Sequence, residues 1–525
     1  MIKYFLSFFL IFITSFALKA QNLSDIDIQQ YIYNITVTDK SDTIIGVSEI
    51  EVLFNKTASE FSIDLINIDN KGNGMIVSEV LDNGKEIPFS HKNDKLTISS
   101  NREAGENHTY TINYYGIPAD GLIISKNKYG DRTFFGDNWP NRARNWVPCV
   151  DHPSDKALVT FKVTAPSHYQ VIANGILNEE TNLNNDYTLY EWKTNVAIPT
   201  KVMVIGIAKF AVQNLGKTNN IPVSSWVYPQ NKEIGFYDFA LTENILDYFI
   251  ENIGPYPYQK LASVQSKTAY GGMENASNIF YPENFITGTR SKEDTMAHEV
   301  AHQWFGNSAT EIDWPHIWLS EGFATYFADL YLEKKYGKRF FNDRLKMQRQ
   351  KVIDFAKRQY TPVVDYETTR YENLINTNSY EKGAWVLHML RKKVGDSLFW
   401  KSIQKYYDTF KLNNASTADL RKIFEEVTGQ DLKLFFKQWL HTAGHPVLAI
   451  VALEDVEKLT LTISQKQEDL FIFPLEINLI YENGSEEIKT FDIIKKEQTL
   501  TIDVKSIVKD VVVDPNVDLL FEEVN

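Results

Sequence analysis

Two histidines four residues apart, His298 and His302, have the residue type and spacing of a metal site. The chain from Asp294 to Phe305 contains neither glycine nor proline, which predicts a helix. Residues four apart share one face of a helix, so the two imidazoles would project together. Both could bind one Zn²⁺, and Glu299 would face the same cavity as a general base for a metal-bound water. Taken alone, the motif leaves open an exposed helix with two unrelated histidines.

Glu321 is the candidate for the third ligand that a catalytic zinc requires. It follows His302 by 19 residues, within the segment from Trp318 to Ala324. We expect Ser320 to cap a second helix that runs to about Tyr336, with Glu321 in its first turn. Two histidines and one glutamate form a catalytic set, because a structural zinc normally has four protein ligands, usually including cysteine. The sequence therefore predicts one Zn²⁺ per chain with an open fourth position.

This motif, H-E-x-x-H followed after 19 residues by the glutamate of W-L-S-E-G-F-A, resembles the gluzincin aminopeptidases. That family includes aminopeptidase N and the bifunctional leukotriene hydrolase. The similarity includes the segment from Gln303 to Asn307 and extends over nearly the whole mature chain. The predicted fold is multidomain α+β: an N-terminal antiparallel β domain, a helix-rich catalytic domain that the resemblance implies is thermolysin-like, and a small C-terminal β-sandwich. The resemblance also implies hydrolysis of the N-terminal peptide bond of peptides that have a free amino terminus.

A second segment resembles the G-x-M-E-N exopeptidase motif of the same family; it consists of Gly271, Gly272, Met273, Glu274 and Asn275. The resemblance implies that these five residues bind the substrate and that the glycines let an extended substrate backbone pair with this strand edge. It further implies that Glu274 holds the free α-amino group by a charge-assisted hydrogen bond. Without the zinc motif, the same residues would be read as a turn with an exposed glutamate. Tyr270 is expected to line the pocket for the first side chain, with broad acceptance of neutral or aromatic residues.

Tyr380 begins the segment Tyr-Glu-Lys-Gly-Ala, which resembles the Y-x-K-G segment of the family. The resemblance implies that the Tyr380 hydroxyl donates a hydrogen bond to the oxyanion of the tetrahedral intermediate. Loss of one such donor typically lowers the rate by about 10²–10³-fold. The chain contains 27 tyrosines, so the residue type alone would place Tyr380 in the core or on the surface.

The sequence departs from the family pattern at two positions. Many relatives hold the substrate amine with a second carboxylate or a glutamine from the N-terminal domain, and that position is Trp139 here. Asp137, two residues earlier, is the alternative, either as an amine ligand or as a plain turn residue. Relatives also often carry an acidic residue seven positions after the zinc glutamate, where it could orient a ligand histidine. This position is Ala328, with Asp329 next to it, so that role remains open.

The elements around these motifs divide the chain into three predicted domains. Short alternating runs from about Ser24 to Phe210 predict an antiparallel β domain with one solvated face, assigned to residues 21–215. A helix is expected from Ile234 to Ile253, and helix-rich sequence continues to about His445, so residues 216–445 form the predicted catalytic domain. Alternation returns after Pro446, which predicts a β-sandwich at residues 446–525. Family members commonly carry a large helical domain instead, so the cleft should be more open.

Composition and the first twenty residues bear on the location of the protein. The chain has 525 residues, 43% hydrophobic and 23% charged, and a net charge of −14, which disfavours nucleic acid as a partner. Residues 1–20 combine Lys3, an apolar run and a small-x-small end, which predicts a cleaved signal peptide and export to the periplasm or beyond. An uncleaved anchor is the alternative, but the run is shorter than the ~20 residues of a membrane span. No later stretch is long and apolar enough to cross a membrane, and Cys149 is the only cysteine, so no internal disulfide can form.

Two other functions remain open at the sequence level. Epoxide hydrolysis is an alternative because one branch of the family supports it at the same zinc site. A non-catalytic peptide-binding relative is the third possibility, and it predicts loss of a ligand or of Glu299. Neither the ligands nor Glu299 are lost.

Overall fold

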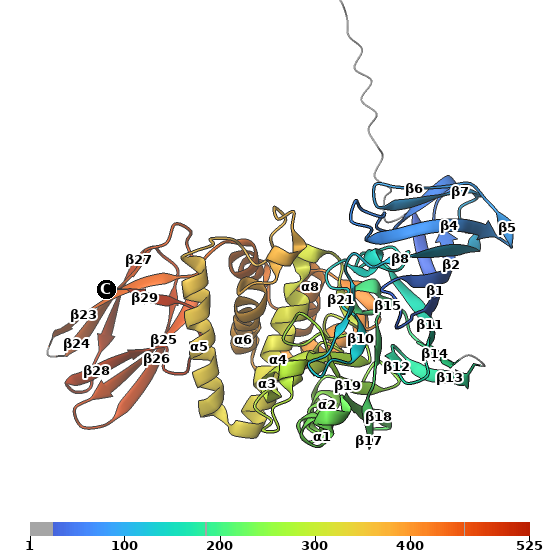
Figure 1. Ribbon diagram of the computed structural model, residues 1–525. Coiled ribbons are helices and arrows are strands. Elements are labelled where there is room, and N and C mark those ends of the chain that lie inside the picture. Colours follow the sequence, from blue (N-terminus) through green and yellow to red (C-terminus); the bar gives the residue numbers. More distant parts are fainter. Residues whose placement is uncertain (1–24, 184–185, 456, 525) are drawn as a thin grey trace, which may run out of the picture.

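The structure is a computed structural model that describes residues 25–183, 186–455 and 457–524. The predicted signal peptide, residues 1–20, lies outside the described residues. Three regions follow one another along the chain, and a helical region lies between two β regions (Figure 1). This arrangement confirms the predicted multidomain α+β class. Within the described ranges, no helix combines the length and apolar character needed to cross a membrane.

The first region is built on one large sheet with the strand order β13-β14-β11-β1-β2-β8-β4-β5. Inward residues such as Ile50, Val52 and Phe54 are buried and alternate with the less buried Glu51 and Leu53, which is the alternation expected of a strand. One pair departs from the antiparallel pattern, because β1 and β11 run parallel after the chain leaves the sheet and returns. The strands are β1 (Ile26–Thr36), β2 (Ile44–Phe54), β4 (Gly74–Asp82), β5 (Lys85–Glu86), β8 (Asn107–Ile117), β11 (Lys156–Pro166), β13 (Ile176–Asn182) and β14 (Tyr187–Lys193), and β15 (Ile198–Pro199) pairs with β11.

Two smaller sheets complete this region. One has the order β3-β7-β6 and the other the order β12-β16-β10-β9. The end of β10 leads directly into residues 137–142, which reach the helical region. The strands are β3 (Ala58–Asp64), β6 (Phe89–Lys92), β7 (Lys95–Arg102), β9 (Leu122–Lys126), β10 (Arg132–Gly136), β12 (Gln170–Ala173) and β16 (Ile205–Ala208).

The helical region begins with a four-stranded sheet of order β17-β18-β19-β20. Its strands are β17 (Ala211–Thr218), β18 (Ile221–Val227), β19 (Leu261–Ser266) and β20 (Asn278–Pro282). Because β17 pairs with β18, the predicted boundary between residues 215 and 216 falls inside a strand of this sheet. The helices are α1 (Lys232–Phe239), α2 (Leu241–Asn252), α3 (Glu293–Ala301), α4 (Trp318–Tyr336), α5 (Lys338–Ala356), α6 (Gly383–Val394), α7 (Asp396–Phe410), α8 (Thr417–Thr428) and α9 (Lys433–Phe436).

The helix expected from Ile234 to Ile253 is two helices, α1 and α2, which meet at Ala240. Phe239 and Leu241 flank this break, and both are buried. A single straight helix would place residues two apart on different faces, so the break lets both side chains enter the core.

The C-terminal region consists of two sheets, with the orders β27-β24-β23-β29 and β26-β25-β28. The alternating apolar residues Leu459, Leu461 and Ile463 of β24 are buried, as are Leu475, Ile477 and Leu479 of β25. An ion pair between Arg349 of α5 and Asp514 links this region to the helices. The strands are β23 (Val447–Asp455), β24 (Lys458–Gln465), β25 (Phe473–Tyr481), β26 (Glu486–Ile493), β27 (Glu497–Asp503), β28 (Val508–Val513) and β29 (Glu522–Val524).

The buried carboxyl of Asp155, just before β11, predicts a pH-dependent stability. It accepts a hydrogen bond from the Ile28 amide at 3.3 Å and lies 3.5 Å from the Tyr31 hydroxyl. Burial raises the pKa of Asp155 to about 8, against about 3.9 in an unfolded chain. At a pH between these two pKa values, Asp155 is protonated in the folded state and ionised in the unfolded chain. The free energy of unfolding therefore falls as the pH rises through this range.

Asp155→Asn keeps the neutral shape, so the Tm of this variant should decline less between pH 5 and pH 8 than that of the wild type. We expect a difference of a few degrees, measured by thermal unfolding at several pH values. Parallel curves for the two proteins would contradict an ionisation of Asp155 in this range.

Candidate metal centre

Helices α3 and α4 place the three predicted ligands. His298 lies in the last turn of α3, and His302 immediately follows the helix with helical backbone angles. Its amide donates to the His298 carbonyl at 3.2 Å, so the two side chains share one face. Glu321 lies in the first turn of α4. Ser320 does not cap this helix, contrary to expectation, because α4 begins at Trp318 and Ser320 already lies inside its first turn.

The ligand atoms of these residues form a small triangle. The two Nε2 atoms of His298 and His302 lie 3.0 Å apart, and Oε2 of Glu321 lies 3.3 Å and 3.2 Å from them. Bonds of about 2.0–2.1 Å in a tetrahedral zinc site require ligand atoms about 3.3 Å apart. The triangle therefore has the size and donor types of a three-ligand zinc site.

The outer ring nitrogens of the histidines are held by partners that sequence reasoning missed. Nδ1 of His302 lies 3.1 Å from the Phe305 carbonyl, to which it can donate, and 3.1 Å from the Ser320 hydroxyl. Thr325, one turn after Glu321, has its hydroxyl 3.4 Å from Nδ1 of His298. Such contacts orient an imidazole so that its other nitrogen can bind metal. The four-residue spacing from Glu321 to Thr325 was the available sequence signal.

Asp329, the acidic residue next to Ala328, does not orient a ligand histidine. It is fully buried and instead accepts hydrogen bonds from Arg344 and Gln348 of α5, at 2.5 Å and 2.7 Å. The role left open at this position therefore falls to Thr325, which contacts His298.

Three buried carboxylates converge on the histidine pair. Glu274, Glu299 and His302 each offer a ligand atom within 4.8 Å of one another, close to the His298–His302–Glu321 triangle. Among the described residues, no lysine or arginine forms an ion pair with any of the three glutamates. Burial lowers the pKa of His302, but Glu321 and Glu274 outweigh it and raise that pKa to about 9. The three glutamates thus bring negative charge that no lysine or arginine offsets by an ion pair, and this fits a site for a divalent cation.

Gly272 lies against the Glu299 side chain, whereas the sequence had suggested that it makes room for substrate. A Cβ built on it would lie 2.3 Å from Oε1 of Glu299, whereas one on Gly271 would meet nothing within 4 Å. Gly272 therefore lets the backbone pack directly over the Glu299 carboxylate. Gly271 leaves open space, in which a substrate backbone could approach.

Backbone contacts fix Glu274 beside this centre. Met273 exchanges two backbone hydrogen bonds with Phe280 of β20, at 2.8 Å and 2.9 Å. The Glu274 carbonyl accepts hydrogen bonds from the side chains of Gln303 and Asn307, at 2.8 Å and 2.6 Å. Both residues follow the candidate ligand His302, so the chain directly after α3 also holds the backbone at Glu274.

A cavity of about 370 Å³ opens over the centre. Its lining includes Tyr270, Gly271, Gly272, Met273, Glu274, His298, Glu299, His302, Glu321 and Tyr380. Tyr380 belongs to an irregular helical turn, Asn378–Lys382, and its ring stacks on His298 at 5.7 Å between centroids. Asn275, predicted to contact substrate, is fully buried and is absent from this lining, so the structure corrects that expectation.

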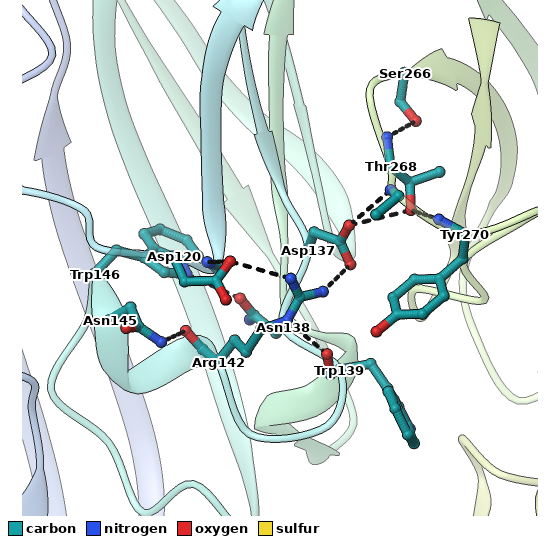
Figure 2. A network of polar contacts seen from close by, with 12 residues as sticks. Asp120, Asp137, Asn138, Trp139, Arg142, Asn145, Trp146, Ser266, Thr268 and Tyr270 are labelled. Carbon is teal, nitrogen blue, oxygen red and sulfur yellow. Dashed lines mark hydrogen bonds and ion pairs between the residues drawn. The ribbon is translucent and has the colours of Figure 1, made fainter. Parts of the chain in front are cut away.

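Asp137 also does not line the cavity. Its carboxylate has no exposed surface and is occupied on both oxygens, by Arg142 on one side and by Thr268 and Ala269 on the other (Figure 2). A buried carboxylate outside the cavity lining does not reach a substrate amine bound there, which corrects the proposed amine-binding role. Trp139, two residues later, does line the cavity.

Two family models match the chain: the Peptidase M1 N-terminal domain over residues 28–202 and the Peptidase family M1 domain over residues 237–439. Relatives include the probable aminopeptidase 1 of Sulfurisphaera tokodaii, 26% identical over 463 residues, which cover 83% of this chain and 55% of that one. The leucyl aminopeptidase of Saccharolobus solfataricus is 26% identical over 482 residues, 86% of this chain and 59% of the relative. The chain thus spans about half the length of these curated relatives.

A crystal structure of a mutant M1 zinc metallopeptidase from Deinococcus radiodurans has the same fold, with a TM-score of 0.68. It is 24% identical and covers 79% of this chain and 94% of its own. Both matched domains lie in the expected order, and the second contains the whole ligand triangle and Glu299. The chain belongs to peptidase family M1.

Proposed function

We propose that this protein is a zinc-dependent aminopeptidase, which hydrolyses the N-terminal peptide bond of peptides. The observation that carries the proposal is that Glu274, Glu299 and the ligand triangle line one cavity. His298, His302 and Glu321 would hold one Zn²⁺, which when bound activates a water and the scissile carbonyl as a Lewis acid. The names of the relatives, which are aminopeptidases, support the same reaction.

The side chains around the ligands would divide the remaining work. Glu299, buried against Gly272, accepts the proton of the attacking water and passes it to the leaving amine. Glu274 pairs with the free α-ammonium and so places the first peptide bond over the centre. The Tyr380 hydroxyl donates to the carbonyl oxygen as negative charge develops there. Tyr270, which lines the cavity, contacts the first side chain, and we expect neutral and aromatic residues to be accepted.

Hydrolysis of a panel of peptides, each with a free or an N-acetylated terminus, tests this function. We expect cleavage only of the free peptides, because Glu274 requires an ammonium group. Glu274→Gln should lower kcat/KM for free peptides by about 10²-fold, since a charge-assisted contact that sets the register is lost. Asp294→Asn, at a partly exposed position in the lining of the same cavity, is the matched control and should change little. Equal cleavage of acetylated peptides would refute the assignment of Glu274.

We also propose that the protein is exported, on the pattern of residues 1–20. The expected mature chain begins at Gln21 and is found outside the cytoplasm. Fractionation of the native host followed by N-terminal sequencing measures both. An intact N-terminus in the cytoplasmic fraction would overturn this proposal.

A further inference from the structure

The chain between β19 and Glu274 needs an external support. Residues 267–272 adopt no helix or strand. They nevertheless include the cavity-lining residues Tyr270 to Gly272 and lead directly into Met273 and Glu274, which also line the cavity. Local contacts are few: the Thr268 amide donates to the Ser266 hydroxyl at 3.3 Å, and the Tyr270 amide donates to the Thr268 hydroxyl at 3.4 Å. Both distances are at the long end for hydrogen bonds, so the loop alone is loosely held.

Asp137 provides that support from a different part of the chain (Figure 2). One of its carboxylate oxygens accepts hydrogen bonds from the Ala269 amide at 3.1 Å and from the Thr268 hydroxyl at 3.2 Å. Asp137 directly follows β10, so this carboxylate ties the N-terminal β region to the loop. A fully buried carboxylate with three donors is costly to disturb, because any donor left unpaired loses its hydrogen bond without gaining water.

Arg142 completes the contact on the other carboxylate oxygen, at 2.8 Å. Its Nε donates to the Trp139 carbonyl at 2.7 Å, which holds residues 137–142 in a compact turn. The guanidinium also lies over the Tyr270 ring, 5.7 Å from its centroid. The Trp139 ring packs edge-on against Tyr270 at 6.0 Å, and both rings line the cavity. The same turn therefore touches the loop at its backbone and at its aromatic side chain.

We propose that Asp137 and Arg142 are positioning residues, which hold the loop of residues 267–272 and thereby set Tyr270 and Glu274 relative to the ligand triangle. The inference rests on the proposed function for its kinetic consequence. It makes the N-terminal β region part of the machinery that grips the substrate terminus, through a residue that touches no substrate. Trp139 contributes one wall of the same pocket.

The hydrogen bond between Asp137 and Thr268 can be tested by substituting either residue. Asp137→Asn places an amide donor against existing donors, and Thr268→Val removes the hydroxyl at nearly constant volume, whereas Thr268→Ser keeps it. Asp120→Asn is the matched control for loss of a carboxylate beside Arg142, because Asp120 is half-exposed, pairs with Arg142 at 3.1 Å and forms no hydrogen bond or ion pair with the described loop residues. Zinc content and Tm establish that each variant is folded.

Hydrogen exchange of the peptide spanning residues 267–274 tests, without reference to activity, whether Asp137 holds the loop. We expect faster exchange in Asp137→Asn and Thr268→Val, and wild-type exchange in Thr268→Ser and Asp120→Asn. Unchanged exchange in Asp137→Asn would overturn the proposal. Should Asp137→Asn fail to fold, Thr268→Val and Thr268→Ser decide the question alone.

Kinetics with a free dipeptide test the positioning role. A displacement of about 1 Å can cost about 10²-fold in rate, so partial release of the loop should raise KM about tenfold, with a smaller change in kcat. Because both residues act through one contact, the double variant should be no worse than Asp137→Asn alone. A purely structural role would lower Tm or the active fraction at unchanged KM, and that result would overturn the proposal. A folded, zinc-loaded wild type that cleaves no peptide would instead refute the proposed function. The exchange measurement would still decide whether Asp137 holds the loop.

Discussion

Glu299→Gln is expected to lower kcat by about 10²–10⁴-fold while the protein keeps its fold and its metal. The substitution retains the volume of a side chain that packs against Gly272, so the cavity keeps its shape. It removes the only function the proposal gives to Glu299, which is to accept and return a proton. A role in packing alone would leave most of the rate, because glutamine fills the same space. Single-turnover hydrolysis of a peptide, together with zinc analysis of the same sample, measures both parts of the prediction.

Asp294→Asn serves as the control for this variant as well, because it lies on α3 and lines the same cavity but is half-exposed. Its kcat should stay within a few-fold of the wild type. Full activity of zinc-loaded Glu299→Gln would contradict the mechanism, since no other residue is assigned the proton transfer.

The parts of the site that depend on helical spacing could be predicted from the sequence. His298 and His302 share a face because they are four residues apart, and Glu321 joins them because α3 and α4 pack together. The three-region architecture followed from alternation and helical periodicity in the same way. These are local patterns, and the resemblance to a known family supplied the roles of Glu274 and Tyr380.

Contacts between distant segments could not be predicted. Asp137 accepts hydrogen bonds from Thr268 and Ala269, which follow it by 131 and 132 positions in the sequence. No local pattern shows which oxygen such a distant donor will use. Gln303 and Asn307 likewise reach back to the Glu274 carbonyl, although they belong to the recognised motif. Gly272 was assigned to substrate access because the approach of the Glu299 side chain appears only in three dimensions. The roles of these small and polar residues therefore follow from tertiary contacts, which the sequence does not show.

Removal of the third ligand should have the largest effect of all. Glu321→Ala leaves only the two histidine nitrogens, 3.0 Å apart, so zinc affinity should fall by far more than the about 10–100-fold that loss of an outer partner costs. The purified wild type should contain one zinc per chain, whereas the dialysed variant should contain almost none and show no measurable hydrolysis.

Thermal unfolding separates this effect from misfolding. Because a ligand that binds only the folded state raises stability with its concentration, added zinc should raise the Tm of the chelator-treated wild type but not that of Glu321→Ala. Glu333→Gln, on the same helix and paired with Arg391 away from the cavity, should behave like the wild type in both assays. If Glu321→Ala bound zinc as tightly as the wild type, the carboxylate would not be a ligand, and the close approach of α4 to the histidine pair would need another explanation. The geometry argues against that outcome, because the Glu321 oxygen stands at the distance from both imidazoles that a shared cation requires.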